Sequence, residues 1–412
     1  MKDSGIPWIG DIPSSWTVEK VKGCLRRHDV KGHGDATVLS LYRDHGVVPK
    51  DSRDDNYNRT GKDTGSYKYV REGDLVINKM KAWQGSLSVS GYDGIVSPAY
   101  FVYEFWSGKL DKGYADYLLR FAYKQEFKRV SGGIREGQWD LPAYEFEHMP
   151  IPLPPLSEQR RIADYLDERC GAIDMVKKSI EGEVEALRRL RAATIFKAVT
   201  KGLDDDVPVR DSEIGWVGTI PESWRIGRIG GLYRQRNIKV NDEDYPPLSV
   251  TKNGIVPQIE TAAKSNDHGN RKLVKVGDFV INSRSDRRGS CGISMLEGSV
   301  SLINTVLEPR DVMAPSYYNH LFHTAEFADE FYRWGHGIVD DLWTTRWQDM
   351  KSMKVPLPPI EEQRYIADYL DERCAAIDSV IEARTQQLER LEDYRKALIY
   401  AYATGKKEVP AS

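Results

Sequence analysis

The chain has 412 residues, of which 40% are hydrophobic and 29% charged, and its formal net charge is −3 at pH 7. This length allows two or three domains, and the composition is that of an ordinary globular protein. No apolar run approaches about 18 residues and the N-terminus lacks an apolar core, so the sequence predicts neither a membrane span nor a signal peptide.

Cysteine and histidine usage argues against metal and redox sites. The four cysteines form no CxxC pair, and the eight histidines show no HExxH spacing. We therefore expect no disulfide framework, no metal site and a reduced, cytoplasmic setting. A phosphate-binding GxxxxGK[ST] loop is also missing. The near-neutral charge does not exclude a local nucleic-acid surface, because the distribution of charge decides that.

Residues 1–150 predict a mixed α/β domain. Short runs rich in β-branched and aromatic residues alternate with turns that contain glycine and aspartate. A helix is predicted over Gly113–Val130, where apolar residues recur on one face. The predicted strands are Thr37–Tyr42, Ser66–Val70, Asp74–Asn78, Ser86–Ser90 and Ala99–Glu104.

Residues 151–202 predict a proline-led spacer helix. Pro152, Pro154 and Pro155 favour an extended lead, and Ser157 is a good N-cap. Apolar residues then follow at steps of three and four, which is typical of a narrow coiled-coil stripe, until Gly202 provides a stop. A helix of about 40 residues would be roughly 60 Å long, a length suited to a spacer.

The remainder of the chain repeats this plan. A polar linker leads into a second predicted domain, residues 203–354, followed by a second spacer helix, residues 355–405, and a tail, residues 406–412. Ile151–Val176 and Val355–Val380 share 20 of 26 residues at a constant offset of 204. The helices are nearly identical and the domains share only a frame, so we expect one common role for the helices and two different domain surfaces.

The duplication also predicts how the parts assemble. Duplicated units tend to pack about a two-fold axis, so the two helices should run antiparallel with a domain at each end. If the two helices ran parallel, the linker after Gly202 would have to span the whole length of a helix, and it is too short to do so. We expect an α+β protein in which two mixed α/β domains are joined by two long antiparallel helices with pseudo-two-fold symmetry.

One loop in each domain carries the strongest candidates for a binding surface. After the predicted strand that ends at Asn282, three guanidinium groups follow, and the matching loop of the first domain offers lysines, a tryptophan and a glutamine. Arginine, lysine and glutamine are side chains that contact phosphates and base edges. The alternative is a solvated surface loop. The candidates are Lys79, Lys81, Trp83 and Gln84 in the first domain and Arg284, Arg287 and Arg288 in the second.

A second pair of loops gives weaker candidates. Gly133–Trp139 and Gly337–Trp343 occupy matching places, and Arg135 and Gln138 of the first of them are further DNA-contact candidates. The tryptophans of these loops are either core side chains or base-stacking platforms. Cys170 and Cys374 lie on the helical stripe and are interpreted as small core residues.

The doubled segment PLPP[LI]xEQRxIADYLDERCxAID resembles a motif of a known family. It is similar to the spacer helices in the specificity subunits of Type I restriction–modification systems, which act in host defence. The Gly73-Asp74 and Gly277-Asp278 strands and the doubled IPxxW openings also resemble the target-recognition domains of that family. The resemblance spans the whole chain, although individual base-reading residues do not carry over from one member to another.

The resemblance implies a DNA-recognition role without catalysis. Each domain would read one half of a bipartite, asymmetric site in double-stranded DNA, and the helices would set the gap and dock two methyltransferase subunits. No cofactor is implied for this chain. S-adenosylmethionine, ATP and Mg²⁺ would be used by the methyltransferase subunits and by a motor–nuclease restriction subunit. The alternative is a scaffold that binds no DNA and carries two protein-binding heads on a helical arm.

Overall fold

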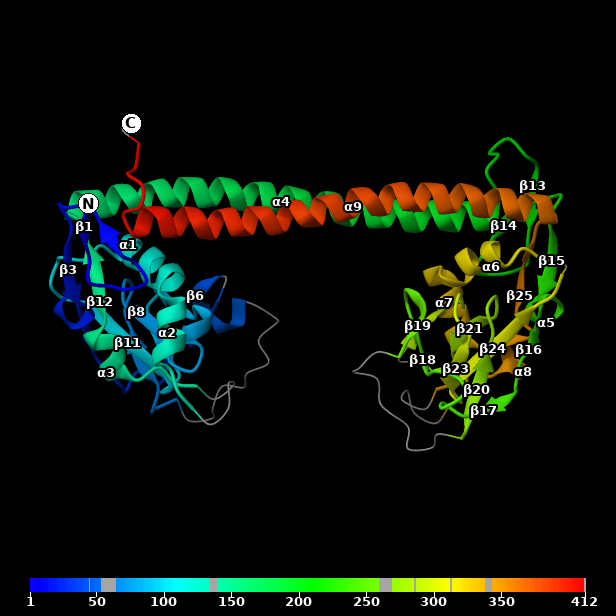
Figure 1. Ribbon diagram of the computed structural model, residues 1–412, viewed down its shortest axis with the longest axis horizontal. Helices are drawn as coiled ribbons and strands as arrows, with labels where there is room; N and C mark the ends of the chain where they lie inside the picture. Colours follow the sequence, from blue (N-terminus) through cyan, green and yellow to red (C-terminus); the bar gives the residue numbers. More distant parts are fainter. Residues whose placement is uncertain are drawn as a thin grey trace. The chain divides into compact units, whose positions relative to one another are not determined.

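The computed structural model describes residues 1–43, 45–52, 64–133, 139–258, 269–284, 287–311, 313–337 and 343–410. The chain divides into two units, and each combines one α/β domain with parts of both long helices (Figure 1). The first unit comprises Met1–Glu181 and Gln386–Ser412, and the second comprises Gly182–Thr385.

An antiparallel four-stranded sheet forms the centre of the first unit, in the order β4–β11–β8–β9. Its central strands are rich in β-branched and aromatic residues, and Leu75, Ile77 and Tyr103 are fully buried in the core of the unit. The bounds of these strands are β4 Leu25–Arg27, β11 Tyr100–Phe105, β8 Leu75–Asn78 and β9 Leu87–Val89.

Two-stranded antiparallel ladders and short helices complete the first unit. The ladders are β1 Lys2–Asp3 with β2 Asp11–Ile12, β3 Thr17–Lys20 with β12 Pro150–Leu153, β5 Leu39–Tyr42 with β6 Gly46–Pro49, and β7 Lys68–Val70 with β10 Gly94–Val96. The helical segments are η1 Val21–Gly23, η2 Lys50–Ser52, η3 Ala82–Gln84, α1 Lys112–Tyr117, η4 Leu118–Ala122, α2 Lys124–Val130 and α3 Ala143–His148.

The second unit repeats the central sheet in the order β16–β24–β21–β22. The register repeats as well, because Asn304 lies opposite Asn282 just as Tyr100 lies opposite Asn78, 204 residues earlier. The sheet and its partners are β16 Tyr233–Gln235, β24 Asn304–Pro309, β21 Phe279–Asn282, β22 Cys291–Ile293, then β17 Lys239–Val240, β20 Arg271–Val274 and β23 Gly298–Ser301 in a three-stranded sheet.

The remaining elements of the second unit are ladders and helices. Helices α6 and α7 lie between the central sheet and the long helices (Figure 1). The ladders are β13 Val209–Asp211 with β14 Thr219–Pro221, β15 Arg225–Arg228 with β25 Lys354–Leu357, and β18 Leu248–Thr251 with β19 Gly254–Pro257. The helices are α5 Ile229–Leu232, α6 Pro315–Phe322, α7 Ala325–Arg333 and α8 Trp347–Met350.

The two long helices are α4, Leu156–Lys201, and α9, Ile360–Ala403. Pro152 lies in β12 and Pro356 in β25, so the chain before each long helix is extended, as predicted from the sequence. Gly202 has φ +79°, a left-handed value that ends α4 at the predicted place. Cys170 and Cys374 are buried in the cores of their units, as predicted.

A buried glutamine fixes the start of each long helix to its own domain. The side-chain oxygen of Gln159 accepts a hydrogen bond from the Asp111 backbone N–H (2.7 Å). Its side-chain NH₂ group donates to the Pro154 backbone carbonyl (2.9 Å). Gln363 does the same in the second unit, accepting from Ala314 N–H (2.9 Å) and donating to a proline carbonyl. Both side chains are fully buried. Losing either glutamine would orphan buried backbone groups, at about 1–3 kcal/mol for each.

Within each unit the two long helices run antiparallel, as predicted. In the first unit, Lys177 pairs with Glu392 (2.7 Å), and an earlier residue of α4, Tyr165, packs against a later residue of α9, Tyr402. In the second unit, Arg191 pairs with Asp378 (2.8 Å) and Glu183 with Arg384 (3.1 Å), which gives the same direction. The fold class predicted from the sequence is therefore confirmed: two mixed α/β domains and two long antiparallel helices in an internal repeat.

The helix predicted over Gly113–Val130 is not continuous. The chain forms α1, a π-helical turn over Leu118–Ala122 and then α2. Tyr123 lies at the break and is fully buried, with its hydroxyl donating to the Pro150 carbonyl (2.6 Å). The π turn is the local adjustment that brings Tyr123 into the core.

Of the described residues, no helix is both long and apolar enough to cross a membrane.

Candidate nucleic-acid interface

The first candidate loop follows β8 and is shaped by its own side chains. Asn78 accepts the Met80 N–H on its side-chain oxygen (3.2 Å), the chain turns through η3, and Gly85 closes the turn with φ +85°. A Cβ at Gly85 would lie 3.0 Å from a backbone carbonyl, so only glycine suits both the left-handed conformation and the space. The loop is therefore a well-defined turn, and it places Lys79–Gln84 at the end of the central sheet.

Only one of the two candidate lysines in this loop has a free ammonium group. Lys79 pairs with Asp140 (2.6 Å), whereas Lys81 is exposed and has no polar partner among the described residues. The side-chain oxygen of Gln84 accepts a hydrogen bond from Arg43 (2.9 Å). The side-chain NH₂ group of Gln84 has no acceptor among the described residues. Lys81 and this NH₂ group are therefore the donors that the loop can offer to a ligand.

An aromatic and cationic cluster supports the first loop. The rings of Trp83 and Trp139 lie 5.6 Å apart, and the Lys128 ammonium lies within 6.0 Å of both ring centres. The Trp83 indole N–H donates to the Met80 carbonyl (3.2 Å). Both tryptophans are half-buried, so part of each ring remains available for contact while the rest braces the loop. Sequence reasoning had named Trp83 but not Lys128, which belongs to α2.

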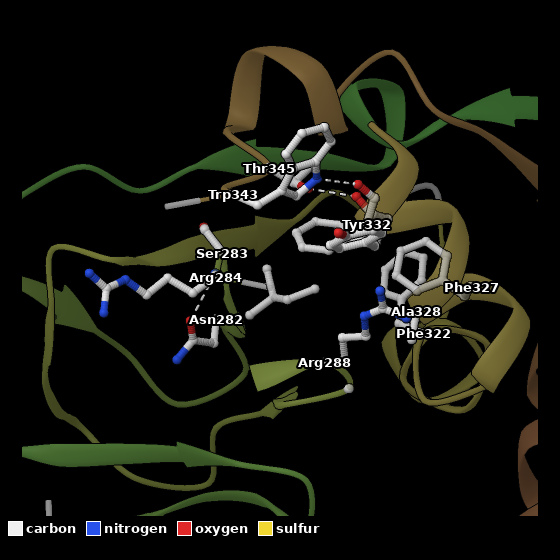
Figure 2. Close-up of a pocket in the computed structure, with 13 residues that line it drawn as sticks. Asn282, Ser283, Arg284, Arg288, Phe322, Phe327, Ala328, Tyr332, Trp343 and Thr345 are labelled. Carbon is white, nitrogen blue, oxygen red and sulfur yellow. Dashed lines mark hydrogen bonds between the residues drawn. The ribbon is translucent and has the colours of Figure 1, made fainter. Parts of the chain in front are cut away.

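The second candidate loop follows β21 in the same way. Asn282 accepts the Arg284 N–H (3.0 Å), and Gly289 closes the loop with φ +73°. Arg284, Arg287 and Arg288 are all exposed. Figure 2 shows the Arg284 guanidinium pointing away from the labelled residues that line the neighbouring pocket, and no described residue pairs with it.

Arg288 is engaged within its own unit. Its guanidinium lies 3.9 Å from the ring centre of Tyr332 and pairs with Asp329 (3.1 Å), both on α7. Tyr332 packs in turn against Trp343, with ring centres 5.5 Å apart, and accepts the indole N–H on its backbone carbonyl (2.8 Å). Tyr332 stands 204 residues after Lys128 and Trp343 stands 204 residues after Trp139, so two positions of this cluster repeat, whereas Arg288 stands 204 residues after Gln84 and not after Trp83.

The cluster borders a small cavity of about 20 Å³ in the second unit (Figure 2). Phenylalanines from α6 and α7 line the cavity, together with both exposed and buried polar residues. Its lining includes Arg284, Arg288, Phe322, Phe327, Phe331, Tyr332, Trp343 and Thr345. Two arginines of the second candidate loop, Arg284 and Arg288, therefore border the same largely apolar cavity.

In each unit the same backbone hydrogen bond ties the candidate loop after the central strand to the chain just beyond the weaker candidate loop, Gly133–Trp139 or Gly337–Trp343. Leu141 N–H donates to the Lys79 carbonyl (3.0 Å), and Thr345 N–H donates to the Ser283 carbonyl (3.0 Å), again 204 residues apart. Arg135 and Gln138 lie outside the described residues.

Buried charges behind the second loop stabilise its strand. Arg236 binds Asp278 through two hydrogen bonds (2.7 and 3.1 Å), and this hydrogen bonding raises the pKa of the guanidinium further above its ordinary value. In the first unit His28 takes the corresponding place beside Asp74 (3.0 Å). The charge partner differs between the units while the aspartate and its turn are the same.

The comparisons identify similar proteins over the full length of the chain. Residues 29–186 match the family model described as Type I restriction modification DNA specificity domain. The putative type I restriction enzyme MjaX specificity subunit of Methanocaldococcus jannaschii is 26% identical, over 97% of this chain and 96% of the relative. The MjaVIII specificity subunit of the same organism is 24% identical, over 97% and 94%.

Solved structures show the same fold. One, described as the structural basis underlying complex assembly and conformational transition of the type I R-M system, has a TM-score of 0.73 at 15% identity, covering 96% of this chain and all of that chain. The HsdS subunit from Thermoanaerobacter tengcongensis has a TM-score of 0.53 at 16% identity, covering 99% of this chain and all of that chain.

Proposed function

We infer that this chain, whose homologues are Type I restriction–modification specificity subunits, is the DNA-recognition subunit of such a system. The observation that carries this inference is a repeated scaffold with unlike loops. Both units share the central sheet, its register, the asparagine turn and the backbone hydrogen bond that Leu141 or Thr345 donates to the candidate loop. Two copies of one scaffold with different readers suit a target made of two different halves.

The differences fall where a ligand would be read. At the offset of 204, Met80 corresponds to Arg284, Trp83 to Arg287 and Gln84 to Arg288. Lys81 in the first loop and Arg284 in the second have no side-chain partner among the described residues, and they are not at matching positions. Guanidinium groups favour guanine, and amides favour adenine. We propose that each unit reads one half-site of double-stranded DNA through the major groove, which makes the target bipartite and asymmetric.

The long helices serve, in this proposal, to set the gap between half-sites and to dock two methyltransferase subunits. Large apolar side chains on the helices support the docking role, because they are exposed on surfaces that this chain leaves uncovered. They include Met175 at 72%, Tyr365 at 66% and Tyr394 at 58% exposed. Methylation with S-adenosylmethionine would then reside in the methyltransferase subunits, and ATP- and Mg²⁺-dependent cleavage in a motor–nuclease subunit.

A cytoplasmic site of action is part of the same proposal. The four cysteines are free and buried, and burial raises the pKa of the Cys291 thiol to about 12. Unpaired, unreactive thiols are expected in a reducing compartment. The alternative of a scaffold that binds no DNA is not favoured, since the similarity to specificity subunits extends over 97% of the chain.

DNA binding by the complete assembly tests the proposed function. The full chain, purified with its methyltransferase subunits, is titrated with a target duplex and with a scrambled duplex at about 50 and 200 mM salt. We expect tight, salt-sensitive binding with a preference for the target of at least about 10³-fold. Equal binding of both duplexes, or no binding at the lower salt, would reject a recognition role.

A further inference from the structure

The turn between β23 and β24 presents two apolar side chains to solvent. Leu302 and Ile303 occupy its tip and are 42% and 41% exposed. Single exposed apolar residues are common on protein surfaces and need no explanation. Here two such residues are adjacent at the tip of one turn. Whether the turn has a binding role depends on how its backbone is held and on which residues it contacts.

Polar groups fix this turn from beneath. The Lys272 ammonium donates to the Leu302 carbonyl (2.9 Å) and to the Asn304 carbonyl (2.6 Å). The Asn304 side-chain amide donates to the Ser301 carbonyl (3.3 Å) and hydroxyl (3.1 Å). Partial burial lowers the pKa of Lys272. The backbone is therefore rigid, and the two apolar side chains are held outward at little further entropic cost.

The turn lies directly against the second recognition loop. Ser283 N–H donates to the Ile303 carbonyl (3.2 Å), and the Ser283 hydroxyl shares a hydrogen bond with Thr305 (2.9 Å). Ser283 immediately precedes Arg284, whose guanidinium has no described partner. The surface of the second unit thus places an aliphatic tip beside a guanidinium group that pairs with none of the described residues.

The first unit has the same turn with a different tip. Lys68, 204 residues before Lys272, donates to the Tyr100 carbonyl (2.8 Å) at the equivalent place. The tip residues there are Pro98 and Ala99, which offer much less aliphatic reach than Leu302 and Ile303. The lysine that holds the turn is repeated in both units, whereas the two residues at its tip differ. The candidate loops show the same pattern of a repeated framework with different exposed side chains.

We propose that Leu302 and Ile303 form an apolar reader that contacts the C5-methyl group of a thymine in the half-site of the second unit, next to the base contacted by Arg284. The proposal rests on the proposed function. Thymine is the base that presents a methyl group in the major groove, and aliphatic side chains favour it over the polar edges of the other bases. The first unit has no such reader, so its half-site does not depend on this contact.

Removing the methyl group from the DNA and the aliphatic groups from the protein tests the proposal directly. Binding of the full chain, assembled with its methyltransferase subunits, is measured on a target duplex and on one whose second half-site carries deoxyuridine for thymidine. The second half-site is the one at which Arg284→Ala alters recognition. For the wild type, each methyl in contact should strengthen binding about fourfold, from the free energy of burying one methylene-sized group. Leu302→Ala/Ile303→Ala should bind the thymine duplex more weakly and show no preference between the two duplexes.

Two controls separate this result from general damage. Val276→Ala removes aliphatic surface that is 61% exposed, at the opposite end of β21 from Ser283, and should keep the full preference for thymine. Deoxyuridine in the first half-site should affect wild type and double variant equally, which also shows that the variant is folded.

Three results would overturn the proposal. These are a double variant that still prefers thymine as strongly as the wild type, a wild type without this preference, and a second half-site that contains no thymine on either strand. A wild-type assembly that does not distinguish target from scrambled duplex would reject the proposed function itself, and this proposal with it.

Discussion

Arg284→Ala is the substitution with the clearest expected effect on recognition. The Arg284 guanidinium is exposed, points away from the cavity, and has no partner among the described residues, so its removal breaks no internal contact that would complicate the result. If it grips a guanine through two hydrogen bonds, its loss should cost about 1–3 kcal/mol of discrimination at one base pair. That corresponds to a decrease in affinity of about 5- to 150-fold at 25 °C.

Arg288→Ala is the matched comparison from the same loop. Its guanidinium is committed to Asp329 and Tyr332, both within its own unit. The exposed ion pair contributes about 0–1 kcal/mol and the cation–π contact about 0.5–2 kcal/mol to holding the loop. We therefore expect Arg288→Ala to lower the stability of the second unit slightly and to reduce affinity without changing which base is preferred.

Fluorescence anisotropy on a set of duplexes, each altered at one base pair of the target, measures both effects. Arg234→Ala provides a charge control, because Arg234 pairs with Glu308 on β16 and β24, away from the turn that precedes β24. Arg284→Ala should relax specificity at one position of one half-site. The reasoning would be refuted if Arg284→Ala left every duplex unchanged, or if Arg288→Ala and not Arg284→Ala altered the base preference.

Three further predictions concern stability and spacing. Tyr317→Phe removes a buried hydroxyl that donates to the Val199 carbonyl (2.7 Å), so urea unfolding should show a loss of about 1–3 kcal/mol; an unchanged midpoint would contradict this. Burial lowers the pKa of His320, so its contribution to stability is complete above about pH 6.5 and declines as the pH falls below that value. Melting temperatures from pH 7.5 to 5 should fall less in His320→Gln; equal declines would contradict the assignment. Seven residues inserted into both helices, after Glu181 and after Thr385, should lengthen the tolerated gap by about 3 base pairs, since two helical turns add about 10.5 Å; an unchanged gap would mean that the helices do not set it.

The periodic and repeated features of the sequence were sufficient to predict the main architecture. Prolines, a helical stripe and a terminal glycine predicted the long helices, and the constant offset predicted two copies of one unit. Val176 and Leu190 belong to the apolar residues that recur at steps of three and four in the first long helix, yet they are 45% and 47% exposed. The helix pair buries a narrow seam, and a pattern in steps of three and four does not show which apolar positions fall outside it.

Long-range partners account for what the sequence could not predict. Gln159 reads as a polar residue in a first helical turn, and its role depends on Asp111, 48 residues earlier. Arg284 and Arg288 look equivalent in the loop sequence. They differ because Arg288 pairs with Asp329, which lies 41 residues later in the chain. That the two domains lie at opposite ends of the helix pair stays a prediction, as do the DNA contacts of the individual loop residues.

Mapping modified bases in DNA tests the central claim most directly. The full chain would be expressed with the methyltransferase subunits proposed as its partners, in cells that lack other such systems, and the methylated positions would be read across the genome. The proposed function predicts one motif made of two unlike halves, separated by a gap of fixed length and free sequence, with Arg284→Ala changing one half alone. A continuous or symmetric motif, or methylation at sites unrelated to the chain, would contradict the claim that two different reading units define the target.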